Sequence, residues 1–368
     1  MAPAFASPKQ AAGFALLLLL LILLPALMGK NALPPREDIY ADIPWRFGPF
    51  NHIRHQIFEE KEDIDILFIG SSRIWSGIDT SQVQKELSKK LGRPAVVQTL
   101  GWAWNGFDAD FFVARDLLQH RKVRMIVFYD ETRLEDAPHP AARYWFRFGD
   151  DAEALRGLPL RIQAIYYFAS ILEMPENLAG LVRANIPDEL VSPEKDHWKT
   201  FFHSKNSAEL MGALTVETNA KPDLPFVRFM PAGGVSTSDV CIYAPETKSR
   251  FSFSGTPTPE WQLHFARKFA ELAKAHGTKL VELNLLPQYA GGPVDTSLIQ
   301  EREFWPEALG AEVAMMGVPP GRLYSGIADQ DMPRLFYMLS HYNMNGQQFY
   351  TRLITPSLLR LYDEQTSK

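Results

Sequence analysis

The sequence predicts an α/β protein: a doubly wound parallel sheet of flavodoxin-like architecture, with an N-terminal transmembrane helix and a large insertion. Three observations carry this prediction. Apolar runs of strand length alternate with helical patterns, the chain starts with a long uncharged leucine-rich stretch, and the middle of the chain loses the alternation. With 368 residues, 46% of them hydrophobic and 22% charged, the chain is long enough to bury a sizeable core.

The first part of the predicted sheet follows from local patterns. Strands are expected at residues 65–69, 94–100 and 123–129, with helices at residues 81–91 and 108–119 between them. Ser81 with Gln84 forms a capping-box pattern at the start of the first helix, and Gly92 suits its end. This β-α-β-α-β order predicts parallel strands with helices on the faces of the sheet.

The alternation stops between residues 131 and 255 and then resumes. We interpret residues 131–255, which include a helical piece at 161–172, as an insertion that forms a lid or a partner surface; a separate small domain is the alternative. Beyond it, a helix is expected at residues 261–275, a strand at 279–286 and a final helix at 345–362.

The N-terminus has the composition of a membrane anchor. No charge occurs between Gln10 and Gly29, and a helix of about 20 residues spans about 30 Å, the thickness of a bilayer core. A cleaved signal peptide is the alternative, but no small-x-small cleavage site follows Pro25. Lys9 before the stretch and the acids after it favour a cytoplasmic N-terminus, with the body of the protein periplasmic or at the cell surface.

The chain therefore divides into three expected parts. Residues 1–30 form the cytoplasmic tip and signal-anchor, residues 31–60 a linker and first helix, and residues 61–368 the main domain. The linker assignment rests on four prolines between residues 31 and 50.

Charge and cysteine content narrow the function classes. The net charge is −5 and no long basic run occurs, which argues against nucleic acid as a partner. Cys241 is the single cysteine, and no Cys/His cluster has zinc spacing, so neither a metal nor a cofactor is expected.

Ser72 is the first candidate for chemistry. It follows Gly70 and Ser71 at the end of the first predicted strand, and open α/β sheets place their sites at the carboxyl ends of strands. Backbone N–H groups in such a turn can face a developing oxyanion. The alternative is a plain strand-to-helix turn capped by serine.

His341 is the second candidate, because it lies just before the final predicted helix. A serine needs a base to become nucleophilic, and histidine is the usual base at neutral pH. A lone histidine near a helix start is more often structural. The chain order, with serine after the first strand and histidine before the last helix, favours the catalytic interpretation.

These two segments resemble the SGNH (GDSL-like) hydrolase superfamily. Gly70-Ser71-Ser72 matches the family's Gly-Asp-Ser element with serine in the aspartate place, so the resemblance makes Ser72 the nucleophile. Gly101 matches the glycine after the second strand, which donates to the oxyanion hole. The family's histidine block falls at the end of the chain, as His341 does here, and the resemblance makes residues 61–368 the catalytic domain.

The Gly-Ser-Ser form and the anchor resemble a narrower, membrane-anchored branch, which includes proteins of alginate O-acetylation and teichoic-acid D-alanylation. That branch works beside a membrane-bound O-acyltransferase. The resemblance implies transfer of an acyl group to or from hydroxyls of a cell-surface polysaccharide through an acyl-serine intermediate. Acetyl is the acyl group that we expect. A simple carbohydrate esterase and a non-catalytic assembly partner of the membrane acyltransferase are the alternatives.

Two positions depart from the family pattern. Met338 stands where the family often has the aspartate that orients the histidine; Asp329 and Asp331 are the nearest upstream acids, and we take Asp331 as the candidate. A Ser–His dyad oriented by a backbone carbonyl is the alternative. After the third strand Asp130 stands where the family has an oxyanion-binding asparagine, and an ionised carboxylate cannot donate a hydrogen bond. The expected oxyanion hole therefore consists of the N–H groups of Ser72 and Gly101 with the Asn105 side chain.

Four further residues are candidates for binding the substrate. Trp75, Trp102 and Trp104 lie near the predicted site in sequence, and their rings could stack on sugars; packing in the core is the alternative. Arg73 follows the nucleophile and could bind an anionic group or pair with a carboxylate.

Overall fold

The computed structural model describes residues 6–27, 35–129, 137–145, 151–183, 216–243, 259–285, 313–338 and 341–366. The chain forms two compact units: Met1–Ile43 with Pro140–Ser192, and Pro44–His139 with Pro193–Lys368. Asp130 and Glu131, which follow the third strand, lie outside the described residues.

The smaller unit is helical. It contains α1 (Pro8–Leu27), α2 (Arg36–Asp42), α7 (Ala142–Trp145) and α8 (Leu160–Arg183), of which α8 extends the helical piece expected at residues 161–172. Arg36 links α2 to the inserted segment, because its guanidinium pairs with the Asp151 carboxylate at 2.8 Å and donates to the Trp145 carbonyl at 2.6 Å.

Helix α1 covers the leucine-rich stretch, and leucines along it are about half exposed. Among the helices of the described residues, none is long and apolar enough to cross a membrane. The expected transmembrane helix is thus without support from the structure.

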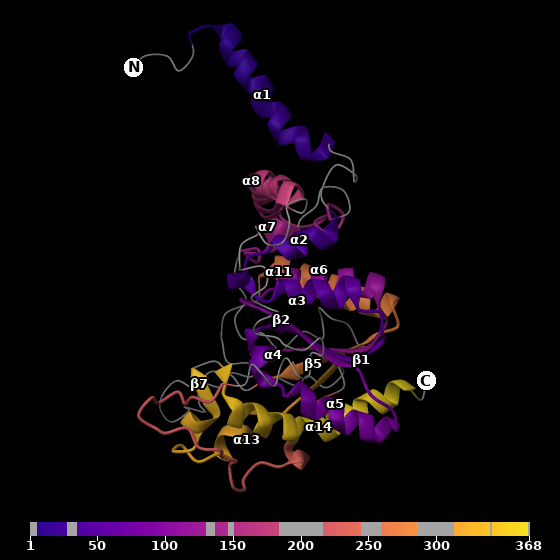
Figure 1. The fold of residues 1–368 in the computed structure, drawn as a ribbon, viewed down its shortest axis with the longest axis vertical. Coiled ribbons are helices and arrows are strands. Elements are labelled where there is room, and N and C mark those ends of the chain that lie inside the picture. Colours follow the sequence, from indigo (N-terminus) through magenta and orange to yellow (C-terminus); the bar gives the residue numbers. More distant parts are fainter. Residues whose placement is uncertain are drawn as a thin grey trace. The chain divides into compact units, whose positions relative to one another are not determined.

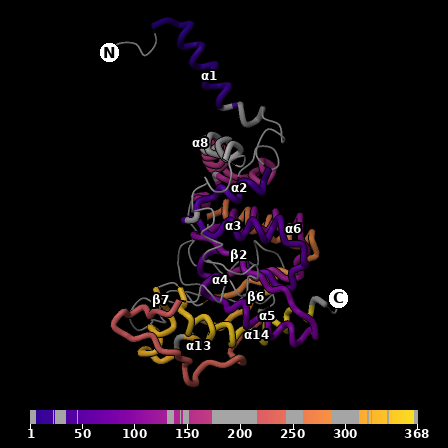
Figure 2. The backbone as a smooth tube through the Cα atoms, in the orientation of Figure 1, coloured from indigo at the N-terminus to yellow at the C-terminus, as the bar shows by residue number. Residues whose placement is uncertain are grey.

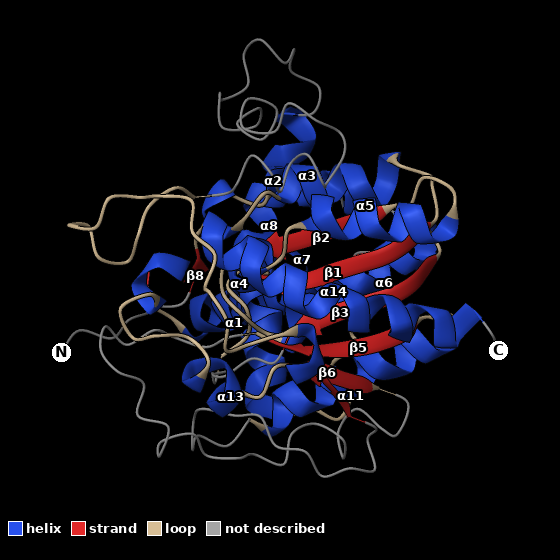
Figure 3. Ribbon diagram, turned by 90° about the horizontal axis from the view of Figure 1, so that it is seen from below, coloured by secondary structure: helices blue, strands red, loops and turns tan. Residues whose placement is uncertain are grey.

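The larger unit is built on a six-stranded sheet (Figure 3). Its strands are β1 (Ile64–Ser71), β2 (Val97–Trp102), β3 (Val123–Tyr129), β4 (Cys241–Tyr243), β5 (Lys279–Asn284) and β6 (Ala314–Gly317). The order is β2-β1-β3-β5-β6-β4, and the strands are parallel except β4, which pairs antiparallel with β6. The predicted α/β class with a mostly parallel sheet is confirmed.

Helices cover both faces of this sheet (Figure 1). On one side lie α6 (Phe107–His120) and α11 (Glu260–Ala275), joined to β3 by ring contacts such as Phe128 with Phe269, whose centroids are 5.5 Å apart. On the other side lie α5 (Thr80–Leu91) and α14 (Met344–Thr366), whose apolar residues share one core with alternate residues of β1 and β3. Strand residues alternate between the two faces, so each face is buried by its own pair of helices.

Shorter elements complete the unit. They are η2 (Trp45–Phe47), α3 (Phe50–Arg54), the π-helical η3 (His55–Glu59), α4 (Ser72–Gly77), η6 (Thr237–Asp239), α13 (Pro320–Ser325), η8 (Met332–Leu335), β7 (Phe336–Met338) and β8 (His341–Tyr342).

One local prediction was wrong. Asp79, not Ser81, caps α5, because the helix starts at Thr80 and the Asp79 carboxylate accepts from the Gln82 N–H at 3.1 Å. Ser81 thus lies inside the first turn. The end of α5 is as predicted, with Gly92 in the left-handed conformation at φ 65°.

Candidate functional site

A tight turn at the end of β1 places Ser72 at the first position of α4. Gly70 has φ 143°, and a Cβ there would lie 3.1 Å from two ring carbons of Tyr129. Only glycine combines that conformation with that close approach. The Ser71 hydroxyl then caps α4 by accepting from the Arg73 N–H at 3.4 Å.

The turn lies where the strand order reverses. β1 has β2 on one side and β3 on the other, and sheets of this kind bind ligands outside the carboxyl ends of the strands at such a point. The side chains of Ser71 and Tyr129 form a hydrogen bond across it. Ser72 is therefore at the edge of the sheet where the sequence placed it.

The structure brings Ser72 and His341 together. Ser72 Oγ lies 2.7 Å from His341 Nε2, although 269 positions separate the residues along the chain. His341 begins β8, which forms an antiparallel hairpin with β7, and α4 packs against β8. A serine hydroxyl that donates to a neutral imidazole is the arrangement of an activated nucleophile.

The imidazole is kept neutral by its surroundings. Burial, and then the positive charge of Arg73, lower the pKa of His341 to about 4. The ring of Tyr337 lies 5.5 Å from that of His341, centroid to centroid, and contributes to the burial. At neutral pH, Nε2 is thus available to accept a proton.

Arg73 belongs to the site through its charge. The residue is buried, and its guanidinium carbon lies 5.3 Å from the centroid of the Tyr129 ring. Tyr129 therefore lies against Gly70, Ser71 and Arg73, which surround Ser72 in sequence. Sequence reasoning missed Tyr129; the signal was a tyrosine as the last residue of the third strand.

The predicted oxyanion-hole residues lie around the carboxyl end of β2. Gly101 pairs with Gly70 in the β1–β2 ladder, and a Cβ on Gly101 would come within 3.2 Å of Trp75 Cβ. Asn105 is half-buried in the loop between β2 and α6. Gly101 thus lies beside the carboxyl end of β1, while the donor roles of Gly101 and Asn105 stay predictions.

The three tryptophans have different environments. Trp102 is fully buried within β2, so the prediction that it binds substrate is wrong and core packing holds for it. Trp75 is half-buried against Gly101. Trp104 is 46% exposed, has φ 62°, and its ring centroid lies 5.6 Å from that of Phe47.

The candidate orienting acid is not at the imidazole. Asp331 precedes η8, and within the described part of the chain no hydrogen bond or ion pair joins its side chain to His341. The prediction that Asp331 orients His341 is therefore corrected: the described structure gives Asp331 no contact with the imidazole. Met338, in the family's aspartate place, pairs with His341 across the hairpin and is exposed.

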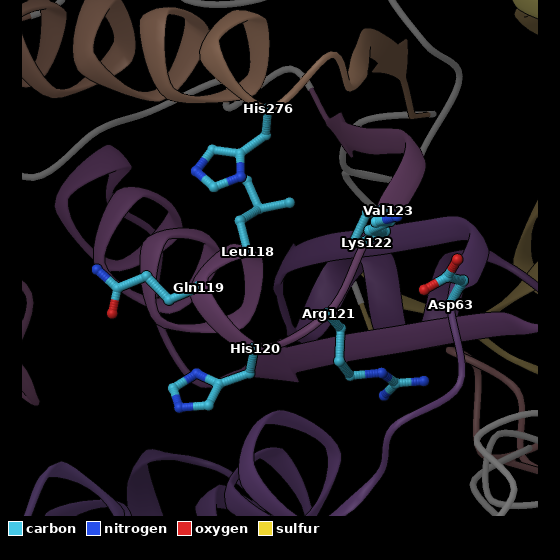
Figure 4. Close-up of a pocket in the computed structure, with 8 residues that line it drawn as sticks. All are labelled: Asp63, Leu118, Gln119, His120, Arg121, Lys122, Val123 and His276. Atoms are coloured by element: carbon cyan, nitrogen blue, oxygen red, sulfur yellow. The ribbon is translucent and has the colours of Figure 1, made fainter.

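A cavity of about 320 Å³ lies elsewhere, at the amino ends of β1 and β3 (Figure 4). Its lining includes Asp63, His120, Lys122 and His276. It is at the opposite end of the sheet from Ser72, so it is distinct from the Ser72–His341 pair. Among the residues that the structure describes, no cluster of three or more metal-ligating side chains occurs.

Comparisons with protein-family models, with curated proteins and with solved structures gave no match for this chain.

Proposed function

We propose that this chain is a serine-dependent acyl-transfer enzyme of the SGNH type. It moves an acyl group, for which we propose acetyl, to or from hydroxyls of a cell-surface polysaccharide. The observation that carries the proposal is the 2.7 Å hydrogen bond between Ser72 Oγ and His341 Nε2. Its position at the carboxyl edge of a parallel sheet, where the strand order reverses, adds to it.

In the first half-reaction, Ser72 Oγ attacks the ester carbonyl carbon while its proton passes to His341 Nε2. The tetrahedral intermediate carries an oxyanion, which the N–H groups of Ser72 and Gly101 and the Asn105 side chain stabilise. Collapse breaks the bond to the leaving alcohol, which takes the proton from His341. The acyl group is then held on Ser72.

In the second half-reaction, an acceptor hydroxyl gives its proton to His341 and attacks the acyl-serine. Collapse returns the proton to Ser72 and releases the new ester. If water is the acceptor, the outcome is hydrolysis, so the esterase alternative uses the same two residues.

Arg73 changes the electrostatics of this cycle. Its charge disfavours the imidazolium, which accounts in part for the low pKa of His341, but the same charge favours an oxyanion nearby. We therefore assign part of the oxyanion stabilisation to Arg73.

The location and partners remain part of the proposal. The exposed leucines of α1 and the uncharged stretch that contains them support attachment to a membrane, with the catalytic domain periplasmic or at the cell surface. A membrane-bound O-acyltransferase is the proposed acyl source, on the family resemblance alone. Fractionation of cells, with protease added outside, tests the attachment and its side.

The deciding experiment compares Ser72→Ala with Ser76→Ala, a second half-buried serine of α4. The full chain is treated with a fluorophosphonate, and acetylation of the surface polymer is measured in cells that carry each variant. We expect labelling and acetylation to be lost in Ser72→Ala and retained in Ser76→Ala.

Other outcomes select the alternatives. Unchanged polymer acetylation in Ser72→Ala rejects the mechanism and leaves an assembly role. Labelling of Ser72, together with aryl-ester hydrolysis that sugar acceptors do not affect, selects the simple esterase.

A further inference from the structure

Asn343 is the centre of a buried hydrogen-bond network two residues beyond His341. Its side chain is 1% exposed, and its Oδ1 accepts from the N–H groups of Asn345 at 2.9 Å and Gly346 at 3.1 Å. Its Nδ2 lies within hydrogen-bond distance of the Thr218 carbonyl at 2.9 Å, Asn219 Oδ1 at 3.2 Å, the Arg334 carbonyl at 2.8 Å and the Phe336 carbonyl at 3.3 Å.

Asn345, two residues further along the chain, has a similar network of buried side-chain hydrogen bonds. It is 1% exposed, and its Oδ1 accepts from the Phe229 N–H at 3.1 Å. Its Nδ2 donates to the carbonyls of Val227 at 3.0 Å and Arg334 at 3.2 Å. Both amides therefore connect α14 to two other segments, one of which lies in the part of the chain interpreted as an insertion.

That inserted segment, residues 216–229, is here called the strap. In Figure 2 the salmon-coloured stretch that contains it runs beside β7. Backbone bonds add to the side-chain bonds: Met344 N–H donates to the Val216 carbonyl at 2.9 Å and Ala220 N–H to the Phe336 carbonyl at 2.6 Å. The strap thus lies against both the hairpin that carries His341 and the start of α14.

The hairpin itself is short. β8 has two residues, β7 has three, and their pairing contains a register irregularity. A two-stranded hairpin of this length is marginal alone in water. Gly346 packs so closely that a Cβ on it would collide with the Leu335 carbonyl oxygen at the end of η8, so α14 starts directly against the segment that leads into the hairpin.

We infer that Asn343 and Asn345 are positioning residues, which fasten the strap to the β7–β8 hairpin and so hold His341 against Ser72. This inference rests on the proposed function. It gives the inserted region a role in fixing the place of the imidazole. A satisfied buried polar network is suited to this role, because it specifies one arrangement of the segments that it joins.

The test measures the rate at which a fluorophosphonate modifies Ser72 in the full chain, in wild type, Asn343→Ala, Asn343→Asp and Asn345→Ala. The matched control is Tyr362→Phe, which removes a buried hydrogen bond to Asp65 Oδ1 at the amino end of β1. We expect the asparagine variants to react about 10- to 100-fold more slowly, the range associated with small misplacements of reacting groups. Tyr362→Phe should keep the wild-type rate, even if its melting temperature falls as far as those of the asparagine variants.

Asn343→Asp adds a readout that loss of stability alone would not give. The substituted carboxylate keeps the acceptor for Asn345 and Gly346 but cannot donate to the strap, whereas the protonated carboxyl regains one donor. The rate of this variant, relative to wild type, should therefore rise as the pH is lowered towards 5.

Hydrogen exchange of peptides covering residues 336–346 keeps the inference separate from the proposed function. Faster exchange there in Asn343→Ala, but not in Tyr362→Phe, supports the positioning role of Asn343. Unchanged exchange, or phosphonylation at the wild-type rate, overturns it. A wild-type Ser72 that does not react overturns the proposed function, and the exchange result then tests only whether Asn343 fastens the strap to the hairpin.

Discussion

Ser72 Oγ and His341 Nε2 lie 2.7 Å apart at the carboxyl end of the central sheet. Asp331, the acid that we expected from the sequence, does not contact this histidine in the described part of the chain. The base is held by a short hairpin and its buried surroundings, and a cation, Arg73, lies near enough to lower its pKa. The imidazolium of His341 is therefore disfavoured, and this should be measurable in the pH dependence of the reaction at Ser72.

Removal of the base should abolish acylation. His341→Ala leaves Ser72 without a proton acceptor, so we expect burst release of nitrophenol from a nitrophenyl ester to slow by about 10²- to 10⁴-fold. The control is His276→Ala, an exposed histidine in the cavity at the other end of the sheet. Equal bursts in His341→Ala and wild type would remove the imidazole from the mechanism.

The pH dependence of the acylation rate should reflect the positive charge of Arg73. Since the pKa of His341 is about 4, the acylation rate should stay level from about pH 8 to about pH 5 and fall only near pH 4. Arg73→Gln removes a positive charge that disfavours the imidazolium, so the pKa of His341 rises and the acid limb moves to higher pH. A limb that does not move in Arg73→Gln, in stopped-flow profiles of the two proteins, would contradict this.

The sequence predicted the parts of the fold and site that depend on local pattern. The strand at residues 123–129 is where periodicity placed it, and Ser72 follows the first strand as a strand–glycine–serine turn requires. The short β4 and β6 were not predicted, because three or four residues show too little alternation to read.

Long-range packing accounts for the errors at the site. Trp102 and Trp104 are two residues apart in sequence, yet one is fully buried in β2 and the other is exposed beyond its end. We chose Asp331 because it is near His341 in sequence. Closeness in sequence does not predict contact here, because η8 and β7 lie between the two residues along the chain. Tyr129 became visible only through its contacts across the sheet.

The free energy of unfolding should fall in mild acid, because His52 binds a proton more readily in the unfolded chain than in the folded one. Burial, and then the charge of His55, lower the pKa of His52 to about 3, below its unfolded value, so the unfolded chain takes up the proton first as the pH drops. The contribution is complete above pH 6.5 and is lost towards pH 3, and it amounts to at most about 5 kcal/mol. Urea unfolding at several pH values should show a flatter profile in His52→Leu than in wild type, with His276→Leu unchanged.

The nucleophile turn should not tolerate a side chain at Gly70. Gly70→Ala places a methyl group 3.1 Å from the Tyr129 ring at φ 143°, so strain and collision add, and we expect a cost of about 2–4 kcal/mol. Gly92→Ala is the matched control, because φ is 65° and nothing lies within 4 Å of the added Cβ; its cost should be about 1 kcal/mol. Similar urea midpoints for the two variants would argue against the close approach of Tyr129.

Trp104 is the tryptophan through which an extended acceptor should bind. It is 46% exposed beside Phe47, and a backbone in the left-handed region, unusual for a bulky residue, holds its ring there. Trp104→Ala should weaken inhibition of aryl-ester turnover by a polysaccharide acceptor about 5- to 30-fold, since the stacking face is lost, while Trp104→Phe keeps part of the effect. The turnover of the small ester itself should be unchanged, because the ester has no sugar unit to stack on the ring. A fall in small-ester turnover that matches the loss of acceptor binding would instead mean that Trp104 shapes the loop beside Asn105 and makes no contact with sugar.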